Sequence, residues 1–139
     1  MRKIKFVSGE YYHIYNRGVE QRKIFESDAD YLKFLRCLKD FNNKSYYEER
    51  FGRLKELSSF LAGLERVVEI LAFSLNPNHF HLIIKQLTEN GVSSFMHKVG
   101  TSFTNYFNKK YDRSGSLFQG SYKAIHINSD EYLLWLSAY

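Results

Sequence analysis

The stretch Leu75-Asn76-Pro77-Asn78-His79-Phe80-His81-Leu82-Ile83-Ile84-Lys85 decides how this chain folds. Its first part, Asn76-Pro77-Asn78, is a turn signal, and the run after it is typical of a β-strand. Side chains two residues apart point the same way from a strand, so His79 and His81 share one face while Phe80 packs on the other. Both imidazoles can then reach one metal ion, which predicts half of a metal site.

A His-x-His pair is also compatible with two partly buried, hydrogen-bonded histidines that bind no metal. The turn before the pair places it at the first residues of the strand, near an edge of the sheet that a substrate can approach.

Composition limits the class of protein. The chain has 139 residues, 44% of them hydrophobic, which suits one globular domain. It has no apolar run of membrane-spanning length and no signal-peptide core, so we expect a cytoplasmic protein that does not enter a membrane. Cys37 is the single cysteine, which excludes an intramolecular disulfide and a cysteine-based zinc site. A net charge of +5 with 17% aromatic residues suits a nucleic-acid surface but does not require one.

Hydrophobic periodicity predicts the elements. Residues 10–17 alternate as a strand, with Tyr12, Ile14 and Asn16 on one face and His13, Tyr15 and Arg17 on the other. Ser27-Asp28-Ala29-Asp30 resembles a capping box, the start of a helix. The expected helices cover residues 28–42 and 92–109, with a short one around 54–61 and a last one starting at 129–131; the other expected strands cover 67–74, 79–85 and 122–127.

The order strand, helix, strand, strand, helix, strand predicts an α+β fold, namely a ferredoxin-like antiparallel sheet with helices packed on one face. The other face is left partly open for a ligand. Residues 1–139 form a single domain in this interpretation, and residues 44–65 are a variable insertion.

Four blocks carry a family resemblance that covers nearly the whole chain. Asn76–Leu82 resembles the histidine-hydrophobe-histidine motif of the HUH single-strand DNA nucleases, specifically the IS200-like and REP-associated tyrosine transposases. Tyr12–Phe25 resembles the first strand and loop of that family, Phe103–Gly120 its helix and basic loop, and Asp130–Tyr139 the start of its nucleophile helix.

The resemblance implies a transposase or endonuclease that cleaves and rejoins single-stranded hairpin DNA through a covalent 5′-phosphotyrosine. His79 and His81 would hold a divalent metal, Mn²⁺ or Mg²⁺, and imidazole ligands suit manganese better than magnesium. A third protein ligand is needed. The family includes dimers and monomers, so a homodimer stays open.

Matching the family's helix selects Tyr139 as the catalytic nucleophile. Tyr106 is the second candidate, although its helical spacing favours core packing. Tyr139 is the last residue, whereas the family continues with a third metal ligand one turn later. We therefore expect a chain truncated at its C-terminus, which is weakly active or inactive and which cleaves far better when extended.

The expected DNA contacts are basic, with two aromatic candidates for base stacking. They are Arg17, Lys109, Lys110, Arg113 and Lys123, with Phe118 or Tyr122 as the stacking residue. Two alternatives remain: a non-catalytic single-stranded nucleic-acid-binding module of the same fold, and a small metal-binding or dimerisation domain. The second leaves the basic loop unexplained.

Overall fold

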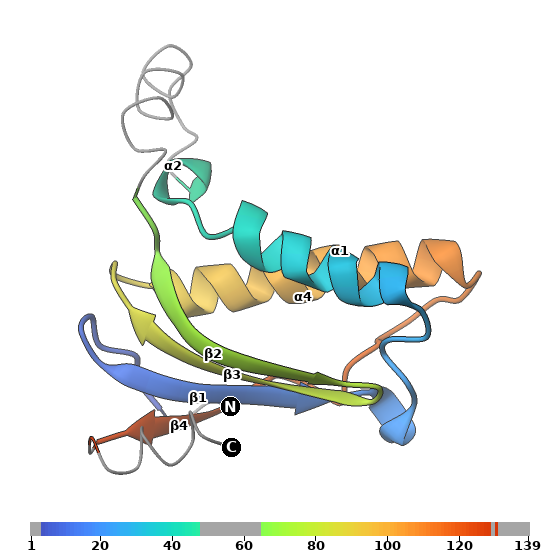
Figure 1. Cartoon of the computed structure of the whole chain (residues 1–139), viewed down its shortest axis with the longest axis horizontal. Helices are drawn as coiled ribbons and strands as arrows, with labels where there is room; N and C mark the ends of the chain where they lie inside the picture. The colour runs from blue at the N-terminus through green and yellow to red at the C-terminus, as the bar shows by residue number, and fades with distance from the viewer. Residues whose placement is uncertain (1–3, 48–64, 129, 131–139) are drawn as a thin grey trace.

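A four-stranded antiparallel sheet carries two long helices on one face. The computed structural model describes residues 4–47, 65–128 and 130. The sheet has the strand order β2-β3-β1-β4, and its strands are β1 (Tyr11–Arg17), β2 (Val68–Asn76), β3 (His79–Gln86) and β4 (Lys123–Ile127). The helices α1 (Asp28–Asp40) and α4 (Gly91–Lys110) lie side by side above the sheet in Figure 1. This is the ferredoxin-like α+β arrangement that the sequence predicted.

The two central strands are antiparallel and in direct register. Tyr15 lies opposite His81, and Arg17 lies opposite His79. Ile14 and Leu82, which are also paired, are fully buried on the helix side. The alternation predicted for these strands is therefore confirmed, and it turns the histidines toward the face that α1 and α4 do not cover.

Aromatic side chains fill the space between the helices and the sheet. Phe34 of α1 and Phe103 of α4 are fully buried and meet at a ring-centroid distance of 5.2 Å. Phe34 also packs on Phe80 of β3 at 5.1 Å. Cys37 is buried in the same core.

The observed element boundaries differ from the predicted ones by one to two residues at most ends. A short helix, α2 (Lys44–Tyr47), and a 3-10 turn, η1 (Val19–Gln21), were not predicted. The helix expected around 54–61 and the last helix lie outside the described residues, except for Asp130.

The predicted capping box at the start of α1 is wrong in detail. Ser27 is the N-cap residue, but its side chain makes no capping hydrogen bond. Its hydroxyl instead accepts a hydrogen bond from Lys110 Nζ, and the Asp30 carboxylate accepts from the backbone N–H of Glu26. The two side chains have partners from α4 and from the preceding loop, which a local motif does not reveal.

Backbone hydrogen bonds join the end of β1 to two other segments. Gly18 N donates to Asn78 O in the β2–β3 turn (2.9 Å), and Gln119 N donates to Arg17 O (2.8 Å). A Cβ atom at Gly18 would lie 2.1 Å from the carbonyl oxygen of Arg22, so only glycine fits at this close approach. The end of β1, the hairpin turn and the segment before β4 are thus held together.

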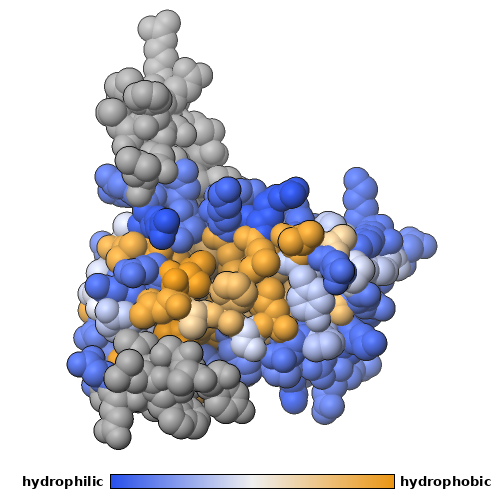
Figure 2. Space-filling view, viewed as in Figure 1, coloured by the Kyte–Doolittle hydropathy of each residue, from blue (hydrophilic) through white to orange (hydrophobic). Residues whose placement is uncertain are grey.

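Apolar side chains form a band across the middle of the view in Figure 2, between α1 and the edge strand β2. The exposed apolar residues include Leu32 of α1 (62% exposed) and Phe73 of β2 (54%). Within the described part of the chain, no helix combines the length and the apolar character needed to span a bilayer.

Candidate functional site

His79 and His81 are the first and third residues of β3 and lie on the face of the sheet away from the helices. Their ring centroids are 5.2 Å apart with the rings nearly perpendicular. Both side chains are half-buried, whereas Phe80 between them is buried in the core. The strand alternation therefore brings the two imidazoles together as predicted.

A hydrogen bond orients each of these two rings through its Nδ1 atom. His79 Nδ1 lies 2.8 Å from Asn78 Oδ1, and His81 Nδ1 lies 2.9 Å from His13 Nε2. An amide oxygen only accepts, so neutral His79 carries its proton on Nδ1 and presents the Nε2 lone pair. Among the described residues, neither Nε2 atom has a hydrogen-bond partner. Holding one imidazole nitrogen by a hydrogen bond while the other stays available is the usual arrangement of metal-binding histidines.

His13 of β1 belongs to this site, although the sequence analysis did not select it. Its ring stacks against His81 with centroids 5.1 Å apart, and Tyr15 packs against both rings. The Nδ1 atom of His13 is buried and has no hydrogen-bond partner in the described structure. The predicted alternation of residues 10–17 had already placed His13 and Tyr15 on one face, but not beside β3.

Burial and a neighbouring imidazole favour the neutral form of His13 and of His81. Burial lowers the pKa of His13, and the nearby His81 lowers it further. Burial likewise lowers the pKa of His81, with an added effect of His79. The neutral form is the one that coordinates a metal ion.

Basic and neutral polar side chains surround the histidine pair in an open cavity of about 650 Å³, which we call the histidine cavity. Arg17 enters from the end of β1 and Lys123 from the start of β4, and none of the described residues that line the cavity is acidic. The other lining residues are Tyr15, Asn16, Gln21, Asn78, His79, His81 and Gln119. Two cations without a carboxylate create a positive potential that suits an anionic ligand.

The described residues supply two imidazole ligands for a metal ion. They contain no group of three or more His, Cys, Asp or Glu side chains placed to hold one. Two imidazoles leave most positions of an octahedral shell to water, substrate oxygen or a further protein ligand. The donor set thus fits a divalent metal that is also bound by its substrate.

The sequence as a whole identifies the family. The family model described as "Transposase IS200 like" matches residues 6–139. The chain belongs to the IS200-like transposases. No protein with a curated function matches it.

Two solved structures share the fold of this IS200-like transposase. A REP-associated tyrosine transposase bound to a REP hairpin matches with a TM-score of 0.66 and 13% identity, over 100% of this chain and 68% of that one. A protein from Deinococcus radiodurans described as a transposase matches with a TM-score of 0.54 and 14% identity, over 99% of this chain and 94% of that one. At these identities the similarity establishes a common fold.

The structure describes only one of the two tyrosines proposed as the nucleophile. Tyr139 lies outside the described residues. Tyr106 lies on α4, on the opposite side of the sheet from the histidines, and its hydroxyl donates to the buried Asp30 (2.7 Å). Burial and that carboxylate raise the pKa of Tyr106, so it has a structural role.

The predicted DNA contacts divide into two groups. Arg17 and Lys123 line the histidine cavity, whereas Lys109, Lys110, Arg113 and Phe118 belong to the end of α4 and the loop after it. The ammonium of Lys110 contacts Asp30 (2.9 Å) and Ser27, which gives it a structural role. Arg113 donates to Asn108 and to Ser116 O, and Lys109 is exposed.

Phe118 packs edge-on against Phe80 with ring centroids 5.8 Å apart. It is half-buried and lines a second hollow rather than the histidine cavity. Tyr122, the other stacking candidate, lines the same second hollow.

Proposed function

We propose that this IS200-like transposase is a metal-dependent endonuclease that cleaves and rejoins single-stranded hairpin DNA through a covalent 5′-phosphotyrosine. One observation carries the proposal: His79 and His81 are both held through Nδ1, with Nε2 available in a cavity lined by Arg17 and Lys123. A REP hairpin is the ligand of one structure with the same fold, which supports a hairpin substrate.

The side chains of this chain have distinct roles in the proposed reaction. His79 and His81 would hold Mn²⁺ or Mg²⁺, which when bound neutralises charge on the scissile phosphate. Arg17 and Lys123 bind neighbouring phosphates and position the strand. His13 fixes the orientation of His81.

The nucleophile in this proposal is Tyr139. Its oxygen bonds to phosphorus and its proton passes to solvent, while the bond from phosphorus to the 3′ oxygen breaks and that oxygen takes up a proton. The phosphotyrosine ester conserves the bond for rejoining, when a 3′ hydroxyl displaces the tyrosine. Within the described residues, Tyr15 is the tyrosine that lines the histidine cavity, so it is the alternative nucleophile.

The test is covalent capture of DNA. The protein is incubated with a labelled hairpin that carries single-stranded flanks, with and without Mn²⁺, and a denaturing gel then detects a protein–DNA adduct. We expect an adduct that requires Mn²⁺ and is lost in His79→Ala and in Tyr139→Phe. Tyr15→Phe is the matched control, because it removes one hydroxyl from the cavity wall and should leave the adduct.

The variants also separate the alternatives. An adduct that is lost in Tyr15→Phe but kept in Tyr139→Phe would move the nucleophile to β1. Salt-sensitive hairpin binding with no adduct under any condition would contradict the nuclease and support a non-catalytic single-stranded nucleic-acid-binding module.

A further inference from the structure

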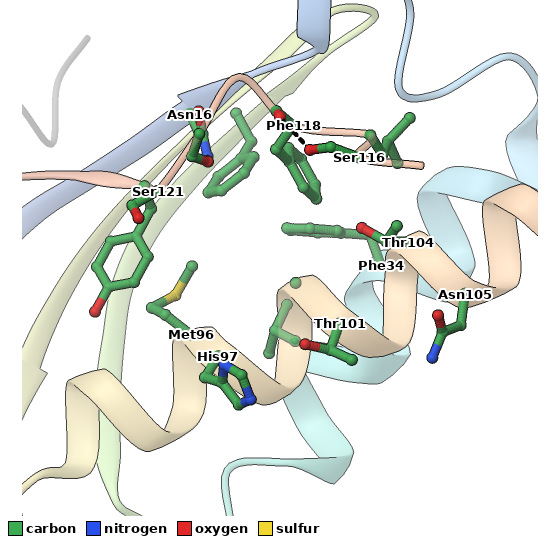
Figure 3. A pocket seen from close by; sticks show the side chains of 16 residues that line it. Asn16, Phe34, Met96, His97, Thr101, Thr104, Asn105, Ser116, Phe118 and Ser121 are labelled. Carbon is green, nitrogen blue, oxygen red and sulfur yellow. Dashed lines mark hydrogen bonds between the residues drawn. The ribbon is translucent and has the colours of Figure 1, made fainter. Parts of the chain in front are cut away.

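A second hollow lies between α4 and the segment 116–122 that leads into β4. Its volume is about 370 Å³, near the small end of the roughly 300–1,000 Å³ of small-molecule sites. We call it the α4 groove. Figure 3 shows Phe118 and Asn16 reaching into it from the loop and the sheet, with Met96 and Thr104 facing them from α4. A hydrogen bond from Ser116 Oγ to Phe118 O, 2.7 Å long and dashed in Figure 3, fixes the loop at this point.

The α4 groove differs from the histidine cavity in charge. Among the described residues that line it, none is Lys, Arg, Asp or Glu. Its walls combine rings and apolar side chains with neutral polar groups such as Thr101, Thr104 and Ser121. Such a surface does not attract a phosphate, but it suits a flat, uncharged ring with donors and acceptors on its edge.

Gly100, in the middle of α4, lies in the lining of the groove. A mid-helix glycine makes the helix less stable than alanine would. Neither usual reason for a glycine applies, because Gly100 has no positive φ angle and a Cβ atom there would meet nothing within 4 Å. Met96 and Thr104 lie one turn before and after it, so the missing side chain keeps the middle of this wall open.

The groove adjoins the histidine cavity. Asn16 lines both hollows, and Gln119 and Lys123 on the cavity side belong to the same stretch of chain as Ser121 and Tyr122 on the groove side. Asn16 is almost fully buried and donates through Nδ2 to Gly120 O (3.2 Å), which holds this dividing stretch in place. A strand whose phosphates contact Arg17 and Lys123 therefore passes beside the groove.

We propose that the α4 groove binds one unpaired base of a single-stranded nucleic acid whose backbone lies along the histidine cavity. The inference rests on the proposed function for its ligand, but it assigns a separate site to the base. Phe118 and Tyr122 offer ring surfaces for contact with the base, and the threonine and serine hydroxyls face its edge. The backbone phosphates stay at the cationic cavity.

The test combines a groove-filling variant with abasic DNA. Gly100→Leu places an isobutyl group in the groove, Gly100→Ala adds only a methyl group, and Ser93→Leu adds the same isobutyl group to an exposed position of α4 outside the groove. Thermal melting checks that each variant is folded. Alanine and leucine both favour a helix more than glycine does, so the two substitutions at position 100 should not unfold α4. The probe is a DNA hairpin with single-stranded flanks, intact or with one unpaired base at a time removed, and fluorescence anisotropy gives the Kd.

We expect Gly100→Leu to bind the intact hairpin about tenfold more weakly, the size of one base-stacking contact, while Gly100→Ala and Ser93→Leu bind like wild type. Removal of one particular base should weaken wild-type binding by a similar factor and have no further effect in Gly100→Leu. The dependence on salt should not change, because no phosphate contact is lost.

The base site would be overturned if Gly100→Leu bound the hairpin with the wild-type Kd. It would also be overturned if each abasic position changed the Kd equally in wild type and in Gly100→Leu. Either result leaves the proposed function intact. If wild type binds no hairpin even at low salt, the proposed function fails and the base site fails with it.

Discussion

His13 shows how one residue outside the recognised motif shapes the candidate site. It lies 68 positions before His81 in the sequence, yet its Nε2 atom is 2.9 Å from His81 Nδ1. If His81 coordinates a metal through Nε2, its Nδ1 carries the proton and donates to His13. His13 is then a positioning residue that fixes the tautomer and the ring orientation of a metal ligand.

Replacing His13 should weaken metal binding without removing a ligand. We expect His13→Phe to raise the Kd for Mn²⁺ by about tenfold or more, as losses of such supporting hydrogen bonds do, because phenylalanine fills space but accepts no hydrogen bond. Isothermal titration of the folded protein with Mn²⁺ measures the effect. His13→Gln retains an acceptor and should lie closer to wild type, and a wild-type Kd in His13→Phe would exclude the positioning role.

At the scale of elements, Asp30 joins α1 to the end of α4. The residue is fully buried, and its carboxylate accepts hydrogen bonds from Tyr106, Tyr111 and Lys110 at 2.6–2.9 Å. Burial by itself raises the pKa of this carboxyl, but the bonds from Tyr111, the Glu26 N–H, Lys110 and Tyr106 outweigh it and lower the pKa to about 2. The start of the basic loop after α4 is thereby anchored to α1.

Asp30→Asn should lower the free energy of unfolding by about 3 kcal/mol, because it leaves Lys110 and two hydroxyls without their charged acceptor. Urea denaturation measures the loss. Asp28→Asn makes the same chemical change at an exposed position two residues earlier and should change stability little. Equal stability of the two variants would show that the Asp30 contacts contribute nothing net.

The Asp30 carboxyl also makes the stability of the protein depend on pH, and its lowered pKa gives the direction of that dependence. A folded-state pKa of about 2, below the ordinary 3.8, means that the stabilisation is present above about pH 4 and disappears as the pH falls from about 4 to about 2. The stability difference between wild type and Asp30→Asn should therefore shrink across that window. A constant difference would contradict the lowered pKa.

At the scale of the whole molecule, the fold separates packing from binding. The helices cover one face of the sheet, and the histidines with Arg17 and Lys123 lie on the other, so the apolar core and the cationic cavity share strands but not side chains. The net charge of +5 favours polyanions in general, whereas the placement of these two cations selects where a phosphate binds.

Arg17→Ala and Lys123→Ala should each weaken binding of a single-stranded hairpin and reduce the slope of log K against log salt by about one. Anisotropy titrations over a range of NaCl concentrations give the slopes. Lys39→Ala removes the same charge from an exposed position on α1, on the helix side of the sheet, and should leave the slope unchanged. If Arg17→Ala and Lys123→Ala have the same slope as Lys39→Ala, no phosphate is bound at the histidine cavity.

Local periodicity was enough to predict the elements around β3. Alternation placed His79 and His81 on one face and Phe80 on the other, and hydrophobic periodicity predicted the two long helices. The capping box was wrong in detail because Ser27 bonds to Lys110, which lies about 80 residues further along the sequence, as it does from Asp30. The DNA contact predicted for Lys110 stays a prediction. Tyr139 and the metal stay predictions.

The sequence by itself determined the order of the elements, the face to which each strand residue points and the family, because these depend on local periodicity and on short motifs. The tertiary structure alone decided that His13 supports His81, that Arg17 and Lys123 share a cavity, that Lys110 neutralises Asp30 and that Asn16 divides two hollows. Each of these depends on strand register and on contacts between distant segments, which no local pattern encodes.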